Sequence, residues 1–176
     1  MSRWIGFQRA VNVGRRAYPM AQLRAALIEA GYREVATHIQ TGNFRVETRR
    51  RSRESVRAHL EQVFATDRGF TVPTLLYSPA ELSQVVDDAD RLGEQHEGSH
   101  YVCLVGAEIA ETVSRALAGL SRPGETVVAA GRSIHLFYDV SFHEAKVGLP
   151  QLEKVIGTGT VRNRRVIDAI ASKWGA

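Results

Sequence analysis

The feature that most constrains this chain is an order of apolar segments that occurs twice. In residues 4–89, runs with strand alternation and runs with helical spacing follow one another as β-α-β-β-α-β-α. The same order returns in residues 101–174, as a similarity of pattern rather than of residue identity. The unit β-α-β-β-α-β is the split unit of ferredoxin-like folds. The sequence therefore predicts an α+β protein of two tandem ferredoxin-like halves, each followed by an extra helix.

Turn and cap residues set the expected boundaries. In the first half, glycine at position 31 favours a left-handed end to the first helix, and the segment 40–43 has the composition of a hairpin turn. We expect strands over 4–11, 35–39, 44–48 and 70–77, and helices over 19–30, 53–66 and 78–89. In the second half we expect strands over 101–105, 126–130, 134–139 and near residue 160, and helices over 109–120, up to 157 and over 166–174.

These patterns divide the chain into a first half over 1–90, a linker over 91–99 and a second half over 100–176. The linker is assigned because residues 90–99 are polar and contain glycine.

Composition limits the setting of the protein. A chain of 176 residues with 44% hydrophobic residues buries enough surface to fold without a metal or a disulfide. Its single cysteine, Cys103, gives no sign of an oxidising compartment. Neither a signal-peptide core nor an apolar run long enough for a membrane span is present. We therefore expect a cytoplasmic protein with no membrane partner, and we leave its oligomeric state open.

The net charge is +4, and 20 of the 23 basic residues are arginine. Arginine binds phosphate and carboxylate through two hydrogen bonds, so this composition suits an anionic ligand or nucleic acid as partner. The alternative is a solvated basic surface from an arginine-rich composition, because a nucleic-acid-binding domain usually concentrates its charge more strongly.

A first candidate site joins the first strand to the first helix, in the segment Arg-Ala-Val-Asn-Val-Gly-Arg-Arg over 9–16. A loop before a helix N-terminus presents backbone N–H groups to an anion, and arginines add positive charge. Arg9, Asn12 and Gly14 are the candidate ligand-binding residues here. The alternative is that Asn12 and Gly14 only shape the turn.

Two further segments supply the remaining candidates. Gln40 and Asn43 lie in the predicted hairpin turn, where they line a polar site or serve only the turn. Arg162 and Asn163 precede the last helix, where arginines suit an anion and Thr160 or Asn163 suits the helix cap.

The densest basic run, Arg-Arg-Arg-Ser-Arg over 49–53, falls in a loop before a helix. Such a run contacts a phosphate backbone or simply lies in solvent. It lacks the interleaved aromatic residues that stack on bases.

No catalytic residue, metal site or cofactor is indicated. The six histidines show no metal-ligand spacing, and neither a P-loop nor a Gly-x-Gly-x-x-Gly fingerprint occurs.

The same segments resemble a bacterial family known as domain of unknown function 1697. Its opening Arg-Gly-Ile-Asn-Val-Gly-Gly, its Tyr-Ile-Gln-Ser-Gly-Asn and its late Thr-x-Arg-Asn-Trp are similar to residues 9–15, 38–43 and 160–164. The resemblance implies the tandem ferredoxin-like architecture and transfers no activity, cofactor or catalytic residue. The chain departs from the family at Ala10 and Arg15, which replace glycines, and at Arg164, which replaces tryptophan.

Our first functional hypothesis is therefore non-enzymatic binding of an anionic ligand or nucleic acid through a polar and basic surface. It predicts salt-sensitive binding that Arg9→Ala or Arg162→Ala weakens. The second is an enzyme acting on a small phosphorylated or carboxylated metabolite, with Asn12, Gln40 and Asn43 positioning the substrate. The third is an assembly module that uses an exposed sheet edge or an apolar patch.

Overall fold

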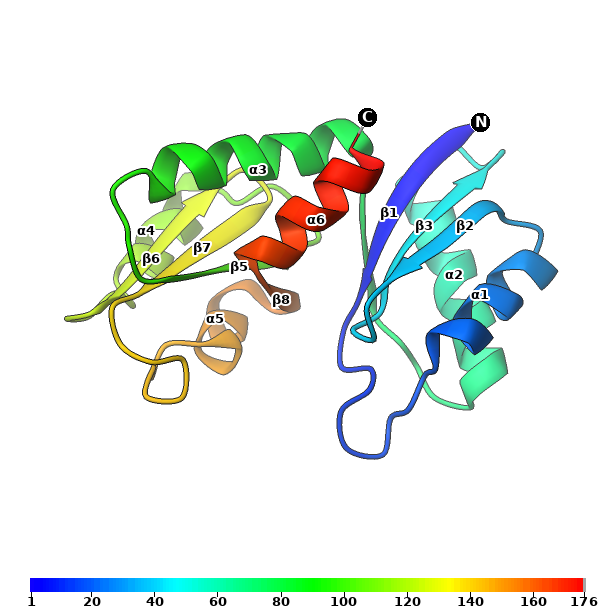
Figure 1. The fold of residues 1–176 in the computed structure, drawn as a ribbon, viewed down its shortest axis with the longest axis horizontal. Coiled ribbons are helices and arrows are strands. Elements are labelled where there is room, and N and C mark those ends of the chain that lie inside the picture. Colours follow the sequence, from blue (N-terminus) through cyan, green and yellow to red (C-terminus); the bar gives the residue numbers. More distant parts are fainter. Residues whose placement is uncertain (176) are drawn as a thin grey trace. The chain divides into compact units, whose positions relative to one another are not determined.

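A computed structural model describes residues 1–175, with strands and helices in the order predicted (Figure 1). The first seven elements are β1 (Ser2–Gln8), α1 (Met20–Glu29), β2 (Arg33–His38), β3 (Asn43–Thr48), α2 (Arg53–Arg68), β4 (Thr74–Tyr77) and α3 (Pro79–Gly93). The next seven are β5 (Ser99–Val105), α4 (Glu111–Ala118), β6 (Glu125–Ala130), β7 (Ser133–Tyr138), α5 (Leu149–Ile156), β8 (Gly159–Asn163) and α6 (Arg164–Trp174). None of the helices within 1–175 combines the length and the apolar composition needed to cross a membrane.

The strands form two separate antiparallel sheets with equivalent connectivity. The first sheet has the order β2-β3-β1-β4 and the second the order β6-β7-β5-β8. In both, the first strand of the unit lies in the centre between the third and the fourth. This is the arrangement of a ferredoxin-like unit, so the predicted fold class of two tandem ferredoxin-like halves is confirmed.

Two strands of the first unit are shorter than predicted, each for a local reason. β1 ends at Gln8 because Ala10 and Asn12 have left-handed φ values of 55° and 56°, which an extended strand excludes. β4 begins at Thr74, directly after Pro73, which has no N–H for the sheet ladder.

The core of the first unit lies between one face of its sheet and the helices α1 and α2. Each helix contributes a stripe of residues three or four apart, as helical periodicity requires. Tyr18 and Phe44 both contact the ring of Phe64 edge-on, at centroid distances of 5.8 and 5.6 Å. The fully buried side chains of this core include Tyr18, Leu23, Leu27, Phe44, Val46, Val56, Leu60 and Phe64.

The second sheet carries helices on both faces (Figure 1). One face packs with α4 and α5 around the buried residues Cys103, Leu117, Ile134, Leu136 and Leu152. On the other face, α6 contacts β5 and β8, and Gly93 at the end of α3 lies against His100 and Phe137.

The chain divides into compact units at a different place from the predicted boundary. Residues 1–80 form one unit and residues 81–175 the other, so α3, which we assigned to the first half, groups with the second. Glu81 in α3 pairs with Arg132 at 2.9 Å, and Asp90 in α3 pairs with Arg164 of α6 at 2.6 Å. Helix α3 continues to Gly93 and β5 begins at Ser99, inside the predicted linker.

Candidate functional site

A pocket of about 460 Å³ lies at one end of the first sheet, where β1 and β2 begin and β3 ends. The register places Ser2 opposite Thr48 and Arg33 opposite Glu47 at this end. The pocket is lined by Met1, Ala30, Gly31, Tyr32, Arg33, Thr48, Arg49, Arg50 and His59. No aspartate or glutamate belongs to this lining, and three of its residues are arginines.

The end of α1 supplies one wall. The N–H of Gly31 donates to the carbonyl of Ile28 and the N–H of Tyr32 to that of Leu27, at 3.0 and 3.1 Å. With Gly31 at φ 85°, these two bonds form a Schellman motif, as expected for this glycine. Because two of the last carbonyls of α1 already accept hydrogen bonds, the helix end presents less negative charge to the pocket.

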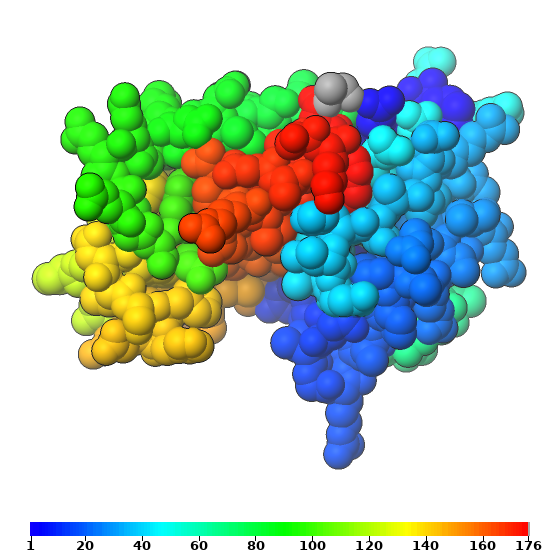
Figure 2. All heavy atoms as spheres, in the orientation of Figure 1, coloured from blue at the N-terminus to red at the C-terminus, as the bar shows by residue number. Residues whose placement is uncertain are grey.

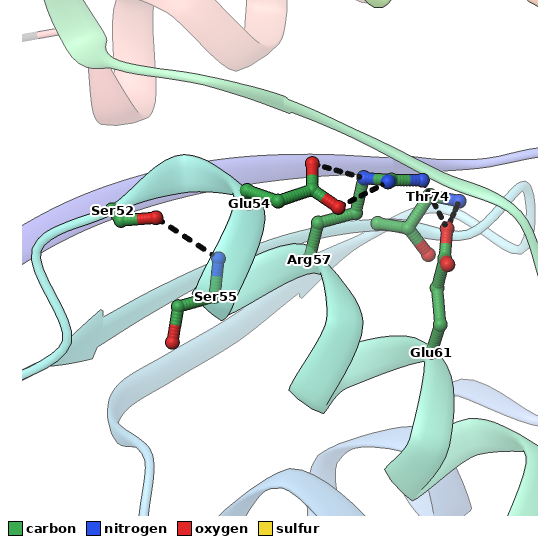
Figure 3. A network of polar contacts seen from close by, with 6 residues as sticks. All are labelled: Ser52, Glu54, Ser55, Arg57, Glu61 and Thr74. Atoms are coloured by element: carbon green, nitrogen blue, oxygen red, sulfur yellow. Dashed lines mark hydrogen bonds and ion pairs between the residues drawn. The ribbon is translucent and has the colours of Figure 1, made fainter.

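The segment between β3 and α2 also lines the pocket. Thr48 is buried, and its Oγ1 accepts a hydrogen bond from the backbone N–H of Arg50 at 3.2 Å, which turns the chain out of the sheet. Helix α2 then starts at Arg53 with Ser52 as its N-cap, because Oγ of Ser52 accepts from the N–H of Ser55 (Figure 3). Arg49 and Arg50 are exposed between these two fixed points.

Tyr32 and His59 line the pocket and contact one another. The phenol Oη lies 2.8 Å from Nδ1 of the imidazole, and the two rings are 5.5 Å apart. Burial raises the pKa of Tyr32 to about 12, and burial followed by the charge of Arg50 lowers the pKa of His59. Both groups are therefore neutral at pH 7. Since the phenol is the better donor, we assign Tyr32 as the donor to Nδ1, which puts the proton of His59 on Nε2.

The three arginines that line the pocket differ from other arginines of the first unit in having no carboxylate partner among the described residues. Three other arginines of the first unit pair with carboxylates: Arg3 with Glu47 at 3.1 Å, Arg45 with Glu34 at 3.3 Å and Arg57 with Glu54 at 2.6 Å (Figure 3 shows the last). Within residues 1–175, the guanidinium groups of Arg33, Arg49 and Arg50 form no ion pair and no hydrogen bond. The pocket thus holds positive charge that the described residues do not neutralise.

The first two predicted segments come together, but at the other end of the same sheet. The loop from β1 to α1, dark blue in Figures 1 and 2, projects from the first unit. Asn12 connects it to the β2–β3 turn, since its Nδ2 donates to the carbonyls of Gln40 at 2.6 Å and Tyr18 at 3.1 Å. Its Oδ1 accepts from the N–H of Tyr18 at 2.8 Å. All the polar atoms of the Asn12 side chain thus hold the two segments in place.

The other candidates in these segments have different surroundings. Asn43 is fully buried, and its Nδ2 donates to the carbonyl of His38 and to Oγ1 of Thr41, which closes the β2–β3 turn. Gln40 and Gly14 are exposed, and Arg9 is half-buried with its backbone N–H donating to the carbonyl of Pro73 at 2.9 Å.

The third segment belongs to the second unit. Arg162 is 9% exposed, and its Nη1 donates to Oγ1 of Thr160 at 2.7 Å and to the carbonyl of Val161 at 3.0 Å. Burial lowers the pKa of Arg162 to about 10. Asn163 is the N-cap of α6, with Oδ1 accepting from the N–H of Arg165 at 2.9 Å, so the predicted cap is confirmed for this residue.

No group of three or more metal-ligating side chains occurs among the residues described, 1–175. The thiol of Cys103 is buried, and burial, with Glu153 nearby, raises its pKa to about 12, which makes it a poor nucleophile.

Comparison with known proteins identifies the family. The family described as "Protein of unknown function (DUF1697)" matches residues 1–135 of the chain. The chain belongs to the DUF1697 family. The solved structure of the conserved bacterial protein SP0830 from Streptococcus pneumoniae is similar over 100% of this chain and 99% of that chain, with 20% sequence identity and a TM-score of 0.77. At this identity the likeness shows the fold. No curated protein sequence matches the chain.

The departures from the DUF1697 pattern have local structural counterparts. Ala10 has φ 55°, the left-handed conformation in which a glycine is favoured. Arg15 is exposed in the loop that follows. Arg164 ties two helices together, because its guanidinium pairs with Asp168 on α6 and with Asp90 on α3, both at 2.6 Å.

Only part of the pocket was predicted from the sequence. The basic run over 49–53 was a candidate for phosphate contact, and two of its arginines line the pocket. Tyr32, Arg33 and His59 were not candidates, because each lies beside an ordinary helix or strand pattern. The pairing of β2 with β3 was a usable signal, since a hairpin closed at 40–43 brings Arg33 to the strand end that precedes Arg49.

Proposed function

We propose that this protein binds an anionic ligand in the pocket of its first unit, without catalysing a reaction. The observation that carries the proposal is that Arg33, Arg49 and Arg50 line one pocket with no carboxylate among its residues. Three positive charges that line one pocket repel one another. A bound anion converts that repulsion into attraction, and arginine suits carboxylate or phosphate geometry.

The ionisable pair in the pocket favours binding over catalysis. A general acid or base works best when its pKa lies near the working pH. The pKa of Tyr32 is raised to about 12 and that of His59 is lowered, so both stay neutral hydrogen-bonding groups at pH 7. An enzyme acting on a small phosphorylated or carboxylated metabolite remains the alternative function, and it would use the same arginines to hold its substrate.

We place this function in the cytoplasm, because the chain has one cysteine and that thiol is free and buried.

A pair of triple variants with equal charge tests the proposal. Arg33→Ala/Arg49→Ala/Arg50→Ala removes the pocket arginines, whereas Arg15→Ala/Arg51→Ala/Arg122→Ala removes three exposed arginines that do not line the pocket. Both lower the net charge by three from +4. Titration calorimetry at low salt with phosphate, pyrophosphate, citrate and oligonucleotides then compares the two with the parent protein.

We expect at least one of these anions to bind the parent protein and the control variant with equal affinity. The pocket variant should bind the same anion about tenfold more weakly, or worse. Binding should weaken as salt is raised. The proposal is wrong if none of the anions binds, or if both triple variants lose affinity equally, because net charge and not the pocket would then explain it. Circular dichroism establishes that each variant is folded.

A further inference from the structure

We infer that the ligand of this pocket is a small phosphate monoester, held by Arg33, Arg49 and Arg50 through its terminal phosphate, with His59 donating a hydrogen bond to it. This inference rests on the proposed function and narrows it from anions in general to one chemical class. It also decides between a small molecule and a nucleic acid, which the composition left open.

The dimensions of the site favour a small molecule. Pockets for small ligands usually enclose about 300–1,000 Å³, and the volume here is about 460 Å³. The three arginines come from two segments, the start of β2 and the residues after β3, which lie at the same end of the sheet because Arg33 pairs with Glu47. A nucleic-acid surface needs instead a groove that follows a backbone with a charge at about every 3.4 Å of each strand.

The charge of the site matches a dianion better than a monoanion. A phosphate monoester carries about −1.5 to −2 charges at pH 7 because its second pKa is near 6. A phosphodiester carries a single charge per phosphate, and three guanidinium groups around it would leave positive charge uncompensated. Since the lining contains no carboxylate, the ligand itself is the group that would balance the arginines.

The pocket offers no aromatic face to a base. Tyr32, which is the aromatic side chain of the lining apart from the imidazole, is 5% exposed, and its ring lies against His59 at 5.5 Å. Proteins that bind single strands without sequence preference stack bases on open aromatic rings. That contribution is missing from this pocket.

His59 completes the donor set without adding charge. With Tyr32 assigned as the donor to Nδ1, the N–H of the neutral imidazole is on Nε2. With Nδ1 occupied, Nε2–H is the ring donor left for a phosphate oxygen. The hydroxyl of Thr48 accepts from the N–H of Arg50 and keeps its own O–H as a second neutral donor beside the imidazole.

Calorimetry on the full chain tests this inference with matched probes. Glycerol 3-phosphate and ribose 5-phosphate are the monoesters, and glycerol and ribose are their uncharged counterparts. An octathymidylate with hydroxyls at both ends supplies diesters without a terminal phosphate, and citrate supplies carboxylates. Arg49→Ala and Arg50→Ala are compared with Arg51→Ala, which removes the next arginine of the same loop and does not line the pocket.

We expect both monoesters to bind at one saturable site, and the octamer to bind at least about tenfold more weakly. Arg49→Ala and Arg50→Ala should each lower the affinity for the monoesters about tenfold, whereas Arg51→Ala should not. Tighter binding of the octamer or of citrate, with the same loss in the pocket variants, would overturn the inference and leave the proposed function standing. If no anion binds, both fail.

His59 provides a second readout by NMR. A bound dianion beside the imidazole favours its charged form, so saturating glycerol 3-phosphate should raise the pKa of His59. The exposed imidazole of His143 is the control within the same spectra. An unchanged His59 titration in the saturated protein would remove this residue from the site.

Discussion

Tyr32 and His59 meet at 2.8 Å between Oη and Nδ1, although 27 positions separate them in the chain. Tyr32 follows α1 and His59 lies on α2, and the packing of these two helices on one sheet face brings the rings together. The pair lines the pocket together with the three arginines. Its protonation state therefore reports on the charge of the site.

Replacing Arg50 should raise the pKa of His59. The positive charge of Arg50 disfavours the imidazolium form and lowers this pKa, second to burial. In Arg50→Ala the burial contribution remains and the charge repulsion is lost, so the pKa moves part of the way toward its ordinary value. An NMR titration of the imidazole measures the change. Arg51→Ala should leave it unaltered, and an equal shift in both variants would show a long-range charge effect instead.

Ala10→Gly should stabilise the protein by about 1 kcal/mol, because a non-glycine residue in the left-handed region costs about 1–2 kcal/mol. Ala10 has φ 55° at the end of β1, in a position where a side chain brings strain. Urea unfolding measures the gain.

Ala17→Gly is the matched control for Ala10→Gly. It lies in the same loop, is exposed and has no positive φ. Glycine there only adds freedom to the unfolded chain, so the control should be neutral or slightly destabilising. Equal effects at both positions would contradict the strain at Ala10.

Gly42→Ala should destabilise the protein more than Gly14→Ala, although both glycines have positive φ, at 74° and 57°. A Cβ at Gly42 would lie 2.6 Å from Cγ2 of Val11 and 2.7 Å from Cβ of Gln8. A Cβ at Gly14 meets nothing within 4 Å. The conformational cost of about 1 kcal/mol is common to both variants, and overpacking adds about 1–3 kcal/mol at Gly42 alone. Equal losses in urea unfolding would show that the Gly42 turn opens freely.

Acid should destabilise the second unit through His135, which is buried, and His100, which is half-buried. Nε2 of His100 lies 3.1 Å from Nδ1 of His135, and Oγ of Ser133 lies 3.0 Å from Nε2 of His135. Burial, then the neighbouring charges, lowers the pKa of His100 to about 3, and burial lowers that of His135 to about 4 despite Asp88. In the unfolded chain both ionise near pH 6.5.

The sign of the pH effect follows from these values. Between pH 6.5 and about 4 the unfolded state binds protons that the folded state excludes, so stability is full above 6.5 and falls as the pH is lowered. The slope is about 1.4 kcal/mol per pH unit for each histidine. Urea unfolding from pH 7 to 4 should show a smaller slope for His100→Gln or His135→Gln. His143→Gln, at an exposed site, should keep the parent slope, and an unchanged slope in the first two variants would refute the assignment.

The sequence by itself determined the architecture. The backbone geometry of strands and helices imposes a spacing of two or of about 3.6 residues on the apolar positions. The order of elements in both halves could therefore be predicted without tertiary contacts. Gly31 and Asn163 were also assigned correctly, because a left-handed helix end and an N-cap are local hydrogen-bonding problems. The predicted ends of β1 and β4 were wrong, because the left-handed φ of Ala10 and the missing N–H of Pro73 shorten these strands.

Tertiary structure decided the site. Asn12 and Asn43 suggested a ligand by their chemistry, and only their hydrogen bonds to Gln40, Tyr18 and His38 show that both hold turns. Arg33, in contrast, carries no signature in the sequence that separates it from Arg3 or Arg57, and the basic run over 49–53 does not show which of its arginines line the pocket. The fold places a carboxylate beside Arg3 and Arg57 and none among the residues that line the pocket. Charge pairing depends on distances of a few ångströms between residues far apart in the chain, and folding alone fixes those distances.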